Sequence, residues 1–141
     1  MIPPHTPPPI GAHIQIKGGL AKGGLAYTDA VDARAVQVFV GNPRGWRPSA
    51  GDPAQDAAFT AGCAERGVPS FIHAPFLVNV GSPNEETVDQ SVATLRHTLA
   101  RGTQLGVQGV VVHAGSAVGA DRYDAAPVSY THLTLPTILR V

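Results

Sequence analysis

The chain is poor in charge and in cysteine, and it has no long hydrophobic run. Its ten basic and ten acidic residues cancel, so any contact with nucleic acid must come from a local patch rather than from an overall field. The lone Cys63 excludes an internal disulfide and a cysteine-based zinc cluster, and it favours a reducing compartment. No stretch approaches the roughly 18 apolar residues of a membrane helix, and Met1–Ile10 lacks the parts of a signal peptide. We therefore expect a cytoplasmic protein with no membrane partner.

The composition divides the 141 residues into three parts. Five prolines within residues 1–9 predict a flexible, extended arm. Residues 10–124 have the pattern of one globular α/β domain. Residues 125–141 are predicted to be a tail foreign to that domain, because Pro127–Val141 has no glycine, alanine or acid and places a proline where a helix should follow. The tail resembles the peptide read when a gene fragment runs into sequencing-adapter sequence, and a natural edge strand is the alternative.

Strands and helices are predicted to alternate along residues 10–124. Short apolar segments predict strands at 10–16, 35–40, 70–72 and 110–112, and helices are expected at 20–31, 52–66 and from 82 to about 106. Short connections of this kind predict a parallel sheet of about four βα units with right-handed crossovers. A closed (β/α)8 TIM barrel takes about 250 residues, so we expect a partial TIM barrel, with a complete open sheet of four strands as the alternative.

Local residue chemistry predicts how two of these helices begin. Asp52 is expected to cap one helix, with Gln55 reaching back to the cap, and Ser82–Glu85 is expected to form a capping box for the next. In that second helix a buried stripe is predicted, and three polar residues are predicted to lie away from it. The stripe comprises Val88, Val92, Leu95 and Leu99; the polar residues are Arg96, His97 and Arg101.

Two predicted strands each end in a histidine, His73 and His113. Pro75 stops the first strand from continuing, which leaves its imidazole at the carboxyl end, where parallel α/β folds build their sites. Neighbouring strands lie about 4.8 Å apart, so the two side chains can converge on one ion. Catalytic zinc commonly takes three protein ligands and water, so this pair is an incomplete site, and buried structural histidines are the alternative. His13 is expected to line the barrel mouth beside them, and Asn79 to orient neighbouring groups. The remaining histidines are expected to be exposed: His5, His97 and His132.

The loop after the second strand carries Arg44, Trp46 and Arg47. Arginine suits phosphate contact or insertion between bases, and an aromatic ring suits stacking. The alternative is that Trp46 packs against the rim of the sheet.

Four motifs together resemble the deoxyribonuclease IV family of apurinic/apyrimidinic endonucleases. They are GAHI with GGL (11–14 and 18–20), QVFVGNPRGW (37–46), HAPFLVNVGSP (73–83) and VVVHAGS (110–116). The resemblance covers about residues 10–124. It implies a zinc-dependent (β/α)8 barrel, monomeric when complete, that cleaves double-stranded DNA on the 5′ side of an abasic sugar with a three-zinc cluster.

Residue by residue, the resemblance makes His73 and His113 ligands of one zinc. Arg44 matches a side chain that enters the DNA at the lesion, and Phe76 falls where the family often has a DNA-contacting tyrosine. The other ligands are expected beyond the fourth strand, so we expect at most one incomplete zinc site and no activity from this chain alone. The alternatives are a metal-dependent sugar-phosphate isomerase or epimerase barrel, and a non-catalytic half-barrel that self-associates through its open edges.

Overall fold

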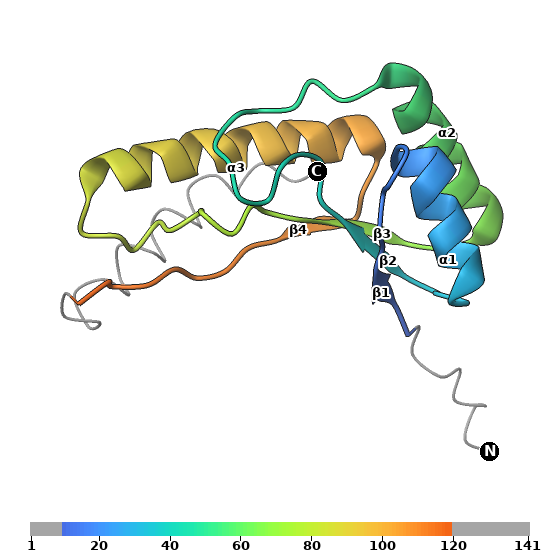
Figure 1. Ribbon diagram of the computed structural model, residues 1–141, viewed down its shortest axis with the longest axis horizontal. Helices are drawn as coiled ribbons and strands as arrows, with labels where there is room; N and C mark the ends of the chain where they lie inside the picture. Colours follow the sequence, from blue (N-terminus) through green and yellow to red (C-terminus); the bar gives the residue numbers. More distant parts are fainter. Residues whose placement is uncertain (1–9, 120–141) are drawn as a thin grey trace, which may run out of the picture.

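A computed structural model describes residues 10–119, which form one parallel sheet with its connecting helices (Figure 1). The four strands are β1 (Ala12–His13), β2 (Val36–Val38), β3 (Ser70–His73) and β4 (Gly109–Val111). They lie side by side in sequence order, and every neighbouring pair is parallel. The predicted α/β class and parallel sheet are therefore confirmed, although β1 is much shorter than the predicted strand 10–16. The predicted arm and tail, with His5 and His132, lie outside the described residues.

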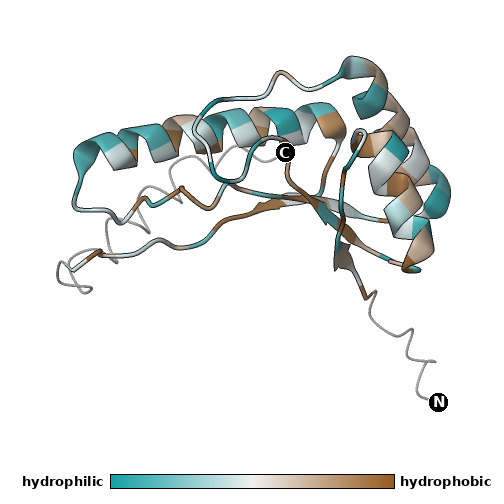
Figure 2. Ribbon diagram, viewed as in Figure 1, coloured by the Kyte–Doolittle hydropathy of each residue, from teal (hydrophilic) through white to brown (hydrophobic). Residues whose placement is uncertain are grey.

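Helices connect the strands and cover one side of the sheet (Figure 1). They are a π-helical segment η1 (Leu20–Leu25) that continues as α1 (Ala26–Ala30), then α2 (Pro53–Arg66) and α3 (Glu85–Leu105). Val38 and Ile72 point to this side and pack with Phe59 and Leu105, all four at most 1% exposed. Burying each such side chain contributes about 1.5–3 kcal/mol. Figure 2 shows hydrophilic residues along most of α3 and hydrophobic residues along β4.

The first predicted helix, 20–31, is not a regular α-helix over its whole length. The carbonyl of Gly19 accepts hydrogen bonds from both Gly23 N (3.0 Å) and Gly24 N (3.3 Å), which widens the first turn. A Cβ on Gly23 would lie 2.1 Å from the Lys17 carbonyl oxygen. The glycines that weaken the helical pattern thus permit a close approach of the backbone to the end of the preceding segment.

Both predicted capping boxes need correction. Asp52 caps α2 as expected, its carboxylate accepting from Ala54 N and Gln55 N. The Gln55 amide does not return to the cap; its Oε1 accepts from the backbone N–H groups of residues 21 and 22, at 3.1 and 3.0 Å. Backbone N–H groups at the start of a helix have no partner within it, and those of η1 donate to this oxygen instead. In α3 the cap is Asn84, which accepts from Thr87 N at 2.9 Å, so the helix begins at Glu85 rather than after Ser82.

The buried face of α3 is rotated and more polar than the predicted stripe. Leu95 is buried, whereas the other three stripe residues are half-buried. Arg101, predicted to lie outside the stripe, is 5% exposed, because it pairs with Asp56 of α2 at 2.8 Å. His97, predicted to be exposed, is half-buried and bonded to the Ser49 carbonyl oxygen. A partner on another element explains both errors, since periodicity within one helix carries no information about such partners.

The end of each longer helix was predicted correctly. Gly67 and Gly106 both adopt the left-handed conformation, with φ of 62°, directly after α2 and α3. Glycine tolerates this conformation best and commonly ends helices. None of the helices within residues 10–119 is long and apolar enough to cross a membrane.

Candidate metal and nucleic-acid site

Five rings gather at the carboxyl end of the strands, on the face of the sheet opposite the helices. Strand alternation puts Val38 and Ile72 under the helices, so Phe39 and His73 project from the other face. The His73 ring lies 5.0 Å from that of His113 and 5.1 Å from that of Phe39, measured between centroids. The structure therefore brings the two predicted ligand residues together.

Two further rings complete this cluster beside His73. Phe76, which is 52% exposed, lies 5.4 Å from His73 and 6.3 Å from His113. His13 lies 6.2 Å from His73 and 4.6 Å from Phe39. His13 thus stands beside the histidine pair, and its predicted supporting role there stays a prediction. We call these five residues the ring cluster: His13, Phe39, His73, Phe76 and His113.

Hydrogen bonds determine which nitrogen two of the imidazoles present. His73 Nδ1 lies 2.6 Å from the Ala74 carbonyl oxygen, and His13 Nδ1 lies 3.0 Å from Gln37 Oε1. Both oxygens only accept, so Nδ1 carries a proton in each ring, and in the neutral imidazole Nε2 is then the nitrogen with the free lone pair. A backbone carbonyl bonded to the far nitrogen is the usual support of a metal-binding histidine. His73 is therefore oriented and tautomerically suited to hold a cation through Nε2.

The histidine pair has no third metal-binding partner in the part of the chain that the structure describes. Among residues 10–119 no group of three or more His, Cys, Asp or Glu side chains is arranged to hold a metal. His73 is half-buried and His113 is exposed. The donor chemistry fits zinc, and the number of ligands fits only part of a zinc site.

Asn79 joins the two loops that follow the histidines. Its Nδ2 donates to the Ser116 carbonyl oxygen at 2.9 Å, and its Oδ1 accepts from Ser116 N at 2.8 Å. Gly115 passes so close that a Cβ there would lie 2.5 Å from this oxygen. Asn79 therefore fixes the loop after β3 against the segment after β4; its orienting role at the site stays a prediction.

The loop after β2 reaches the same end of the sheet. Arg44 is exposed, and its N–H donates to Asn42 Oδ1 at 3.0 Å. The Pro43 carbonyl oxygen accepts from Phe76 N at 2.9 Å, which ties this loop to the ring cluster. Trp46 is half-buried and packs against the second core cluster, so its position matches the alternative of packing at the rim. The second core cluster comprises Ala74, Val78, Val80 and Leu95.

Sequence reasoning missed Phe39, which touches three members of the ring cluster. The available signal was the alternation of Gln37 and Phe39 with the valines of β2.

Cys63 lies elsewhere, in the core between sheet and helices, where burial raises the pKa of its thiol. A buried thiol with a raised pKa is a poor metal ligand.

A family model described as xylose isomerase-like TIM barrel matches residues 25–133. The chain belongs to this family. The matched segment runs on to residue 133. The domain boundary expected at residue 124 stays a prediction. Membership confirms the expected partial barrel and replaces the alternative of a complete open sheet.

Relatives within the family carry endonuclease names. Probable endonuclease 4 of Streptomyces avermitilis is 48% identical over 130 residues, which cover 92% of this chain and 42% of that protein. Endonuclease 4 of Thermus thermophilus is 43% identical over 112 residues, covering 77% of this chain and 41% of that protein. A crystal structure of endonuclease IV from Thermus thermophilus matches with a TM-score of 0.74 at 38% identity, covering 91% of this chain and 47% of that chain.

These matches confirm the resemblance to deoxyribonuclease IV that the four sequence motifs carry. The chain spans less than half the length of the relatives it matches. Its four strands correspond to the first part of the family barrel, and the ring cluster stands at the carboxyl end of those strands, where barrel enzymes build their sites.

Proposed function

We propose that this chain forms the first part of a zinc-dependent DNA repair endonuclease that cleaves the phosphodiester bond 5′ to apurinic/apyrimidinic sites. The observation that carries the proposal is the His73–His113 pair, with ring centroids 5.0 Å apart and the first ring oriented by the Ala74 carbonyl. The endonuclease names of relatives at 48% and 43% identity support the substrate class. We also propose the cytoplasm as its compartment, in agreement with a single buried cysteine.

In this proposal His73 and His113 would hold one zinc ion through ring nitrogens. Zinc, when bound, supplies Lewis-acid chemistry that acidifies water and stabilises negative charge at a phosphate. Phe76 packs edge-on against His73, Phe39 packs against it in a tilted orientation, and the two rings shield part of it from water. Arg44, exposed on the neighbouring loop, contacts the DNA at the lesion, while Phe76 offers a ring face to the strand and Trp46 supports the loop.

We propose further that this chain alone turns over little or no substrate. Two histidines give one incomplete site, whereas the complete enzyme is expected to hold three zinc ions with additional carboxylate and histidine ligands. The chain spans 42% of the Streptomyces avermitilis relative, so more than half of the family barrel is available to supply them.

Zinc binding by the purified chain tests the metal part of the proposal. We expect His73→Ala and His113→Ala each to lower zinc affinity at least tenfold, a loss in the range expected when a ligand or its support is removed. His13→Ala is the matched control, because it removes an imidazole from the same face without breaking the pair. Equal zinc affinity in all three variants and the wild type would refute the assignment.

Binding to duplex DNA tests the substrate part. An abasic duplex should bind more tightly than an undamaged one of the same sequence, and Arg44→Ala should remove most of that difference. Arg34→Ala is the control, since Arg34 is an exposed arginine just before β2, at the end of the strand away from the ring cluster. A nicking assay on the same duplex tests the inactivity: robust turnover that a chelator abolishes would contradict it.

The family description, xylose isomerase-like TIM barrel, keeps a second candidate in view, a metal-dependent sugar-phosphate isomerase or epimerase. Such an enzyme also places metal ligands at strand ends but has no use for an exposed arginine loop beside them. Weak binding to abasic DNA together with competition by a sugar phosphate for the zinc-loaded chain would favour it.

A third candidate is a half-barrel that self-associates without catalysis. Within the described sheet β1 and β4 each pair with one strand only, and Val111 of β4 is 41% exposed. Open edges of this kind favour pairing with other chains. A single monomer peak in size-exclusion chromatography across concentrations would exclude this candidate.

A further inference from the structure

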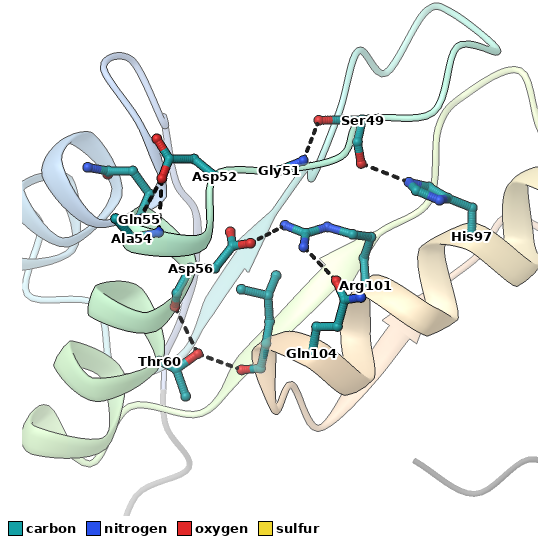
Figure 3. A network of polar contacts seen from close by, with 11 residues as sticks. Ser49, Gly51, Asp52, Ala54, Gln55, Asp56, Thr60, His97, Arg101 and Gln104 are labelled. Atoms are coloured by element: carbon teal, nitrogen blue, oxygen red, sulfur yellow. Dashed lines mark hydrogen bonds and ion pairs between the residues drawn. The ribbon is translucent and has the colours of Figure 1, made fainter.

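The loop that carries Arg44 is anchored at its far end by two residues of α3 (Figure 3). His97 Nε2 donates to the Ser49 carbonyl oxygen at 3.0 Å. One helical turn later, the Arg101 guanidinium lies directly against the Gly51 backbone, since a Cβ on Gly51 would come within 2.2 Å of Nη2. Positions four apart share one helix face, so α3 presents both anchors to the same short segment, residues 49–51.

Arg101 is a rigid support because its own position is fixed on two sides. Its Nη2 pairs with Asp56 Oδ2 at 2.8 Å, and its Nη1 donates to Gln104 Oε1 at 2.7 Å. The side chain is 6% exposed. Figure 3 shows this network crossing from α2 to α3 below the segment that carries Ser49 and Gly51. The loop therefore rests on a junction between two helices rather than on one mobile side chain.

Between its two ends the loop packs against the rest of the protein through Trp46, which contacts the second core cluster. A cavity of about 240 Å³ lies between the loop and α3, lined on the loop side by Trp46 and Pro48 and on the helix side by Ala93 and Thr94. Because packing attraction falls off steeply across a gap, the His97 hydrogen bond and the Arg101 contact at residues 49–51 fix the distance between the far end of the loop and α3.

We propose that His97 and Arg101 are positioning residues that set the place of the loop 41–51, and through it the place of Arg44 relative to the ring cluster. The proposal rests on the proposed function for its effect on DNA, since Arg44 is the side chain that would meet the lesion. The front of the loop is fixed to Phe76 through the Pro43 carbonyl oxygen, so a shift at residues 49–51 would tilt the loop about that point.

Trp46 makes the loop position measurable without DNA, because it is the only tryptophan in the chain. We expect His97→Ala to move the Trp46 emission to longer wavelength and to raise its quenching by acrylamide, with far-UV circular dichroism unchanged. Affinity for an abasic duplex should fall by about 3- to 10-fold, the usual effect of losing one hydrogen bond. His97→Gln, whose amide can donate to the same carbonyl, should restore both. Arg96→Ala, at an exposed neighbouring position, is the control.

A second pair of variants tests the Arg101 anchor without removing its charge. Gly51→Ala places a methyl group against the guanidinium, whereas the methyl group added by Gly67→Ala would have no other atom within 4 Å. Both glycines have positive φ, 76° and 62°, so the two substitutions carry similar backbone strain and differ in the clash. We expect the change in Trp46 fluorescence and the loss of DNA affinity only in Gly51→Ala.

The two signals separate failure of this proposal from failure of the proposed function. Unchanged Trp46 emission and quenching in both His97→Ala and Gly51→Ala would overturn the positioning role, whatever the DNA result. A clear change in Trp46 fluorescence in a chain whose wild type shows no preference for abasic DNA would support the anchors and count against the endonuclease assignment.

Discussion

The ion pair between Asp56 of α2 and Arg101 of α3 should be strongly coupled energetically. Their closest atoms are 2.8 Å apart, and the side chains are 13% and 6% exposed. Two unit charges about 4 Å apart attract by ~4 kcal/mol at an effective dielectric constant of about 20. Much of this attraction offsets the cost of removing both charges from water. Asp56 Oδ1 and Arg101 Nε are also buried without a hydrogen-bond partner among the described residues, which reduces the net benefit further.

Single and double substitutions should therefore give very different results. Asp56→Asn leaves the guanidinium buried without its counter-ion, and we expect a loss of about 3–5 kcal/mol in the free energy of unfolding. Arg101→Met should cost somewhat less, because the more exposed Asp56 can regain water. The double variant Asp56→Leu with Arg101→Met should cost about 1 kcal/mol or less, since apolar replacement of a buried pair is often nearly neutral.

Urea unfolding of the full chain, followed by far-UV circular dichroism, measures these free energies. The cycle should be completed with each single substitution, and Asp52→Asn is a control that changes an exposed aspartate on the same helix end without touching Arg101. A loss below about 0.5 kcal/mol in Asp56→Asn, a surface-like value, would mean that water reaches the pair. Additive losses in the double variant would mean that the two charges do not interact.

Three further outcomes are expected. Cys63 is 5% exposed and burial raises the pKa of its thiol, so a thiol reagent should label it only after denaturation. Asn84→Ala should lower the free energy of unfolding in urea by about 1 kcal/mol, because it removes a helix cap, and Ser82→Ala should lower it by less than half of that. Equal losses would mean that Ser82 acts as the cap. The hydrogen bond from Arg66 lowers the pKa of Asp29. This pair therefore stabilises the fold above about pH 4, and its contribution disappears as the pH falls through the lowered pKa. In Asp29→Asn, the free energy of unfolding measured in urea should fall less steeply below about pH 4 than in the wild type.

The parts of the fold that depend on residues adjacent in the sequence were predictable from the sequence. Asp52 before Pro53, and Gly67 and Gly106 after helical patterns, mark helix ends because capping is a local matter of free N–H and C=O groups. The Gln55 amide and the Arg101 guanidinium took partners from other elements instead. Such partners depend on how helices are placed against each other, which no local pattern encodes.

The candidate site was predictable to a similar degree. His73 and His113 were found because parallel strands bring their carboxyl ends to one edge, so two strand-terminal histidines must be neighbours. Phe39 was missed because alternation in a short apolar strand does not say which set of side chains faces the helices. The role of His97 depended on the Ser49 carbonyl, in a loop whose path the sequence does not define.

The order of the strands in the sheet bears on how the protein is made. Each strand pairs with the one that precedes it in the chain, so every new strand finds its partner already synthesised. The ribosome adds about 5–20 residues per second, so the N-terminal strands are available first. In a growing chain of this topology, no strand after β1 has to wait for a later one before its sheet neighbour is present.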